Sequence, residues 1–143
     1  MAITQAMATS FKVQLLNGVH NFSANTFKLA LYTSSATLNE NTTAYSSSNE
    51  VASTGNYSAG GNTLAVSVTP TNSGNVAFIS FTNSSWANAT ITANGALIYN
   101  ANASNAAVAV LAFGGDKTST NGTFAVNFPT ADASNAIIRL TAS

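Results

Sequence analysis

Short segments in which apolar and polar side chains alternate recur along this chain, and they constrain its fold more than any other feature. Phe27, Leu29 and Leu31 alternate with their neighbours, and the same alternation runs from Leu64 to Thr69. Clusters of Asn, Gly and Ser separate further segments of this kind, at 76–82, 90–92, 96–99, 108–113, 123–128 and 137–140. Because successive side chains of a β-strand point to opposite faces, the pattern predicts strands at intervals of about 8 to 15 residues. With no helical pattern between them, such strands favour a mainly β fold, an antiparallel β-sandwich or jelly roll.

Two stretches of the predicted body differ from a simple succession of strands. Alternation up to Pro70, a turn at residues 72–75 and a second apolar segment from Val76 predict a β-hairpin. Both faces of that second segment are apolar, so we expect a central strand covered on both sides. Residues 34–61 are polar and rich in turn residues, which predicts a long loop over the body with at most a short strand near Val51.

An amphipathic helix is predicted at the N-terminal end. Ile3, Met7, Phe11 and Leu15 recur at every fourth position, which is the spacing of one helix face, and Gly18 stands where a helix could be capped. We therefore expect a helix over residues 4–17, followed by a β body over residues 26–141. A chain of 143 residues suits one domain, so 1–143 is predicted to be a single unit.

The chain is almost free of charge. Charged side chains make up 6 % of it, four basic and four acidic, whereas an ordinary globular domain has roughly 25 %. A neutral polar exterior costs little to desolvate when a neighbour covers it, which favours a subunit of an assembly. Binding several phosphates needs clustered basic groups, so we expect no nucleic-acid partner. The basic residues are instead scattered: Lys12, Lys28, Lys117 and Arg139.

Cysteine is absent, which excludes disulfides, thiolate metal sites and a cysteine nucleophile. The first ten residues lack the basic start and continuous apolar run of a secretory signal. No later segment approaches the ~18 apolar residues of a membrane helix. We therefore expect a chain that is made and assembled in a cytoplasm and has no membrane partner.

Groups that could carry chemistry are few and far apart. His20 is the single histidine, and no spacing gives it a catalytic or metal-binding companion, so a hydrogen-bonding role after the helix is favoured. The Gly114–Lys117 segment favours a β-turn over a calcium or phosphate loop. We expect no enzyme, with no catalytic residue, no cofactor and no metal. The carboxylates are widely separated: Glu40, Glu50, Asp116 and Asp132.

The aromatic residues leave a second function open. Trp86 and the tyrosines could stack on sugar rings, in which case they would be exposed in a concave patch. That alternative is a tail or fibre component that binds a host-surface receptor or glycan. The favoured interpretation places these rings in the core or at a subunit contact. The tyrosines are Tyr32, Tyr45, Tyr57 and Tyr99.

Several segments in this order resemble a family of small virion structural proteins from tailed phages. Four of them carry most of the resemblance, and shorter segments at 43–45, 50–51 and 57–61 fit between them. Together they span nearly the whole chain. The four segments are 11–22 (FKVQLLNGVHNF), 27–33 (FKLALYT), 95–100 (GALIYN) and 124–129 (FAVNFP).

The resemblance implies a β-sandwich protein that is present in many copies on the virion, at the capsid surface. It implies a capsid cement or decoration role, in which the protein binds across major capsid subunits and stabilises the shell. Such proteins work as homo-oligomers, often trimers. We expect the contacts to come from the N-terminal helix and from residues 38–57 of the loop. The residues are Met7, Phe11, Lys12, Leu38, Tyr45 and Tyr57.

Overall fold

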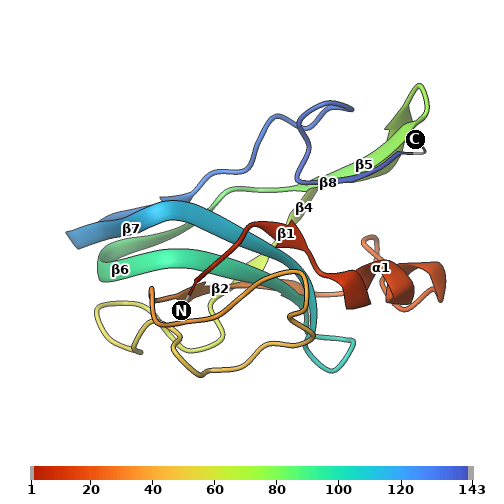
Figure 1. The fold of residues 1–143 in the computed structure, drawn as a ribbon. Helices are drawn as coiled ribbons and strands as arrows, with labels where there is room; N and C mark the ends of the chain where they lie inside the picture. The colour runs from red at the N-terminus through yellow and green to blue at the C-terminus, as the bar shows by residue number, and fades with distance from the viewer. Residues whose placement is uncertain (1, 142–143) are drawn as a thin grey trace.

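A computed structural model describes residues 2–141, which form two antiparallel β-sheets and one short helix (Figure 1). The sheets are arranged as a sandwich that is not closed, so the predicted mainly β, sandwich-like fold is confirmed. The five-stranded sheet has the order β1 (Ala6–Met7), β7 (Ala106–Val126), β6 (Ser84–Asn100), β2 (Phe27–Tyr32) and β3 (Asn62–Leu64). The three-stranded sheet has the order β4 (Val66–Ser73), β5 (Val76–Phe81) and β8 (Ile138–Leu140), and the helix α1 spans Thr9–Leu16.

β6 and β7 form one long hairpin. Their pairing runs from Asn100 opposite Ala106 to Ser84 opposite Val126, with four shifts of register along it. Figure 1 shows the two strands side by side along the molecule. The four separate strands predicted in this region are therefore two continuous ones. The predicted β-turn at Gly114–Lys117 is wrong as well, because these residues lie within β7. Residues 113–116 form a bulge opposite Asn94, and Lys117 pairs with Ala93 of β6.

The predicted hairpin at residues 64–82 is confirmed, but its first strand is divided between the sheets. Leu64 ends β3 in the larger sheet, and two residues later Val66 begins β4 in the smaller one. Pro70 has no N–H to donate, and the β4–β5 register shifts around it, between Val68 and Thr71. β5 is central, as predicted, yet only residues 79–81 of it are buried. The strand with nearly all its side chains covered is β2.

The helix begins five residues later than predicted, because the first residues pair with strands instead. Ala6 and Met7 pair with Val110 and Ala109 of β7, and Ile3 makes a bridge with Leu38. The spacing of apolar residues still describes burial correctly. Phe11 is fully buried, while Ile3, Met7 and Leu15 pack against the core. The same face is thus built from a strand followed by a helix.

Gly18 ends α1, as predicted. Its φ of 73° lies in the left-handed region, which favours glycine. The N–H of Val19 donates to the carbonyl of Gln14 at 2.9 Å and that of Gly18 to Leu15 at 3.2 Å, which is the Schellman pattern. The chain therefore turns sharply after Asn17 and leads into the segment 17–26.

The loop 34–61 passes along the outer face of the five-stranded sheet, below it in Figure 1. It contains isolated bridges at Leu38, Ala44 and Glu50 and no strand, in agreement with the prediction. Its last residue, Gly61, is packed so closely on β2 that a Cβ there would stand 1.7 Å from the carbonyl oxygen of Leu29. Only glycine permits this approach.

Phenylalanine rings connect the helix with both sheets. The ring of Phe22 stacks on that of Phe27 in β2, with their centroids 4.5 Å apart, and its centroid is 6.1 Å from that of Phe11 in α1. The ring centroid of Phe81 in β5 is 5.9 Å from that of Phe27, and this contact joins the smaller sheet to the larger one. The ring centroid of Phe128 is 5.7 Å from that of Phe81. Aromatic pairs at these distances contribute about 0.5 to 1.5 kcal/mol beyond their buried area. This end of the molecule is therefore held by rings from several segments.

Candidate protein-contact surface

The large hydrophobic side chains that remain exposed belong to α1, to the turn after it and to β8. Val13 is 57 % exposed, Leu16 90 %, Val19 43 % and Leu140 48 %. We call these four residues the apolar rim. A single exposed leucine needs no explanation, but a group of apolar side chains at one end of a molecule marks a surface that other protein can cover.

An apolar cleft of about 310 Å³ opens between the end of α1 and the three-stranded sheet. Figure 1 shows these two parts diverging at the same end of the molecule. Leu15, Gly18 and the segment 20–22 line one wall, and residues of β5 and β8 line the other, with Phe78, Ile79 and Leu140 among them. Leu140 belongs to both the cleft and the apolar rim, and Leu16 and Val19 follow directly after the lining residues Leu15 and Gly18 in the chain.

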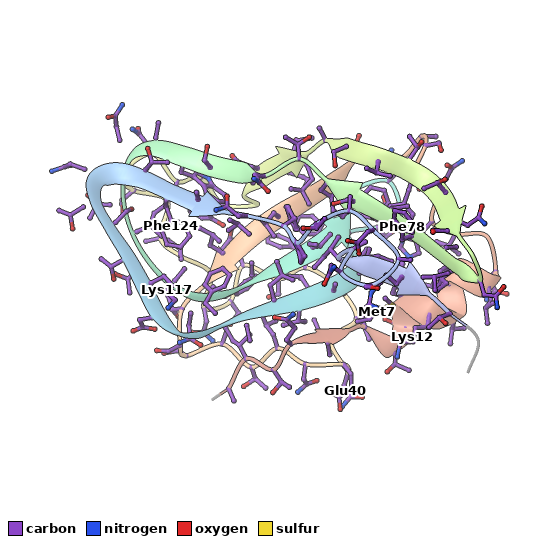
Figure 2. The ribbon with its side chains drawn as sticks, turned by 90° about the horizontal axis from the view of Figure 1, so that it is seen from above. Met7, Lys12, Glu40, Phe78, Lys117 and Phe124 are labelled. Atoms are coloured by element: carbon purple, nitrogen blue, oxygen red, sulfur yellow. The ribbon has the colours of Figure 1, made fainter. Side chains whose placement is uncertain are left out.

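The cleft contains no charged side chain among its lining residues. Lys12 is exposed on α1, and Figure 2 shows it at the same end of the molecule as Phe78, with Lys117 of β7 toward the opposite end. A partner that fills the cleft would therefore present apolar or neutral groups rather than an acidic or basic patch.

The residues predicted to make contacts are distributed differently from the apolar rim. Phe11, Leu38 and Tyr57 are buried in the chain's own core, with 0 %, 7 % and 2 % of their surface exposed. Met7 and Tyr45 are half-buried and pack against that core, and Lys12 alone among the six is exposed. Contact of these residues with another protein stays a prediction. Three of them are therefore part of the chain's own hydrophobic core.

The apolar rim was missed as a site in the sequence. Leu16 and Val19 flank the buried face of the predicted helix, and such flanking residues were assigned to packing. The available signal was the width of the apolar face, since Val13 and Leu16 lie off the Phe11–Leu15 side of an eight-residue helix. No sequence signal marked Leu140, because alternation alone does not show which face of a short strand is covered.

The aromatic residues do not form an exposed platform. Trp86 is 5 % exposed, and Tyr32, Tyr57 and Tyr99 are each 2 % exposed or less. Trp86 packs on Tyr57 and Phe124, with ring centroids 5.6 and 6.3 Å away. The glycan-binding alternative predicts an exposed Trp86, and this prediction is wrong because Trp86 is buried. These rings belong to the core.

Glu50 is surrounded by hydroxyl groups rather than by a second carboxylate. Tyr45 and Tyr57 donate their hydroxyls to it at 2.6 and 2.5 Å, and the N–H of Gly60 donates at 2.7 Å. Tyr99 in turn donates to the carbonyl of Gly60 at 2.7 Å. Burial, and then the nearby Glu50, raises the pKa of Tyr99 to about 12. The same two causes raise the pKa of Tyr45 and that of Tyr57 well above their ordinary value. The tyrosines are therefore neutral hydrogen-bond donors. Their hydrogen bonds to Glu50 and Gly60 hold the 34–61 loop in place on the sheet.

The other polar groups considered as chemical candidates also have structural partners. Asp116 accepts a hydrogen bond from Asn94 at 3.0 Å. Asp132 accepts from the backbone N–H groups of Ser134 and Asn135, and hydrogen bonds from Asn135 and Ser134 lower its pKa. His20 bonds to two amide side chains, which is the role predicted for it.

Within residues 2–141, no group of three His, Asp or Glu side chains could hold a metal ion. None of the helices in this part of the chain has the length and apolar character to cross a membrane. Comparisons with protein-family models, with curated proteins and with solved structures find no match. The class that the chain can be assigned to is therefore the one its fold defines, a mainly β protein of two antiparallel sheets.

Proposed function

We propose that this protein is a non-enzymatic structural subunit of a tailed-phage particle, a cement or decoration protein that binds across major capsid subunits and stabilises the shell. The observation that carries the proposal is the apolar rim beside an uncharged cleft. The sequence resemblance supplies the partner, and the low charge of the chain supports a covered surface. The cleft and the rim are the proposed contact surface.

The physical basis is burial of apolar surface with little polar desolvation. Covering a side chain as exposed as Leu16 contributes about 2 kcal/mol. The four rim residues together could offset much of the cost of association, which is about 4 kcal/mol or more. A module that binds adjacent subunits only in their mature arrangement stabilises that arrangement by mass action.

A direct test adds the purified protein to capsids that lack it. We expect saturable attachment and a higher temperature of capsid disruption. Leu16→Ser should weaken attachment about 30-fold, which corresponds to the ~2 kcal/mol of lost burial. The same substitution should leave the thermal unfolding temperature of the free protein nearly unchanged, because Leu16 is exposed.

The matched control is Ala125→Ser, which makes an apolar-to-hydroxyl change on an exposed residue of β7 away from the cleft. It should attach like the unmodified protein. Failure of the unmodified protein to attach to the capsids that lack it would contradict the capsid role. Normal attachment of Leu16→Ser would contradict the assignment of the contact surface.

We also propose that the protein acts as a homo-oligomer, with a trimer as the form that the resemblance implies. Light scattering of the free protein and of protein released from capsids tests this. A trimer in either sample supports the proposal, whereas monomers in both contradict it.

A further inference from the structure

His20 lies at a junction of three elements. It follows α1 in the segment 17–26, and its ring centroid is 4.8 Å from that of Phe11 in the helix and 6.4 Å from that of Phe27 in β2. Its Nε2 is 2.9 Å from Oε1 of Gln14, and its Nδ1 is 3.0 Å from Nδ2 of Asn100 at the end of β6. The residue is 7 % exposed.

Backbone groups determine which atom of Asn100 faces the histidine. The N–H of Asn102 donates to Oδ1 of Asn100 at 2.9 Å, so the oxygen of this amide is fixed on that side. The amide nitrogen then donates to both His20 and Oδ1 of Asn25, each at 3.0 Å. Oδ1 of Asn25 is identified independently, because it accepts from the N–H of Asn21 at 2.9 Å.

The protonation state of the ring follows from this orientation. Nδ1 of His20 faces a donor and must accept, so it carries no proton. The proton of the neutral ring is on Nε2, where it is donated to Oε1 of Gln14. A proton added to Nδ1 would face the N–H of Asn100 and break this contact.

We infer that His20 is an acid-sensitive latch, which in its neutral form holds α1 and the segment 17–26 against β6 and on protonation releases them. The inference does not depend on the proposed function, since it concerns the free protein. His20 and Asn21 also line the apolar cleft, so release would change the shape of that cleft.

No charge near the ring compensates for protonation. The groups that contact it are Phe11 and Gln14 from α1, Phe27 from β2 and Asn100 from β6, all uncharged. Lys12 of α1 is exposed, β6 has no charged residue, and a Cβ on Gly60 would lie 3.4 Å from Nζ of Lys28 of β2, which places that ammonium near Gly60. Burial lowers the pKa of His20 below its ordinary 6.5. The unfolded chain therefore takes up the proton first, and stability is lost as the pH falls below 6.5.

The test is a pH titration of the full chain between pH 7.5 and 5. His20 is the single histidine of the chain, and the ordinary pKa of a histidine, 6.5, lies within this range. We expect amide hydrogen exchange in α1 and residues 17–26, corrected for intrinsic pH dependence, to rise by up to about tenfold per pH unit below 6.5. His20→Gln keeps an acceptor and a donor but cannot titrate, and it should lose this dependence.

Two further measurements on folded protein keep the inference testable if His20→Gln does not fold. Nitrogen NMR of the unmodified protein should show Nε2 protonated and Nδ1 unprotonated at pH 7.5. Gln14→Glu places a carboxylate at Nε2 and should raise the pKa of His20 relative to the unmodified protein. A proton on Nδ1 at pH 7.5, a His20 pKa at or above 6.5 in the unmodified protein, or exchange that does not change with acidification would each overturn the latch.

Discussion

At the scale of single residues, Glu50 has a structural role in the 34–61 loop. Its carboxylate accepts hydrogen bonds from Tyr45, Tyr57 and the backbone of Gly60, and so joins both ends of the 45–60 part of the loop. The hydroxyl of Tyr57 also accepts from the N–H of Leu31 at 2.9 Å, which connects the network to β2. These partners could not be predicted from the sequence, because hydroxyl donors from separate positions form no local pattern.

Replacing Glu50 with glutamine should destabilise the fold by about 2 to 3 kcal/mol. A neutral amide cannot accept from all three donors, and its NH2 group would face at least one of them. Urea unfolding followed by circular dichroism measures the loss, and hydrogen exchange should increase first in residues 45–60. Glu40→Gln is the control, because Glu40 is exposed, and it should change stability by less than about 0.5 kcal/mol. Equal stability of both variants would refute the role given to Glu50.

The tyrosines predict a loss of stability at alkaline pH. The pKa of Tyr99 is raised from 10.0 to about 12 by burial and then by Glu50, and those of Tyr32, Tyr45 and Tyr57 are raised as well. The unfolded chain therefore loses these protons first, so stability is complete below pH 10 and declines between about pH 10 and 12. Thermal unfolding at successive pH values, with tyrosinate absorbance recorded in parallel, measures this. Appearance of tyrosinate in the folded protein near pH 10 would contradict the prediction.

At the scale of elements, the sequence predicted where strands lie better than where they end. β2 was predicted with its observed bounds, because alternation is regular and turn residues flank it. Within β6 and β7, the Asn- and Gly-containing stretches between the predicted strands include Asn88, Asn94 and the Gly114–Gly115 pair. They instead occupy bulges, which retain strand pairing on both sides, and tertiary pairing decides between a bulge and a turn.

The N-terminal segment shows the converse error. A spacing of four residues places side chains on one helix face, but it is also an even spacing, which keeps side chains on one face of a strand. Ile3 and Met7 therefore fit a strand as well as Phe11 and Leu15 fit a helix. Pairing with Leu38 and with β7, which are distant in sequence, determines the outcome.

The distal half of the β6–β7 hairpin depends on a small aromatic group. Trp86 contacts Tyr57 and Phe124, and Phe124 lies 6.3 Å from Phe113. Trp86→Ala should cost about 3 to 5 kcal/mol, since it leaves a cavity between the hairpin and the loop. Urea unfolding measures the change, and hydrogen exchange should locate the loosening in residues 84–93 and 117–126. Ala87→Ser, an exposed neighbour, is the control. A cost below about 1 kcal/mol for Trp86→Ala would contradict this packing role.

At the scale of the whole molecule, composition and alternation predicted the class of fold, whereas the arrangement of the two sheets could not be predicted. The sheets share no strand, and the chain passes between them at Ala65 within one alternating segment. The smaller sheet has three strands and the larger sheet five, and the apolar cleft lies between the smaller sheet and the end of α1. Which side chains this arrangement leaves exposed is a property of the assembled strands, so Leu140 of the apolar rim could be recognised only after they were placed.

The low charge of the whole chain predicts weak dependence on sodium chloride. Four basic and four acidic side chains give a net charge of zero, so screening has little long-range interaction to remove. The unfolding temperature, and the affinity for capsids if the proposed contact is correct, should change little between about 0.05 M and about 0.5 M. Sulfate strengthens apolar burial and should raise both. Calorimetry and a capsid sedimentation assay in the two salts make the comparison. Attachment that falls steeply with chloride would show that charges, rather than the apolar rim, bind the partner.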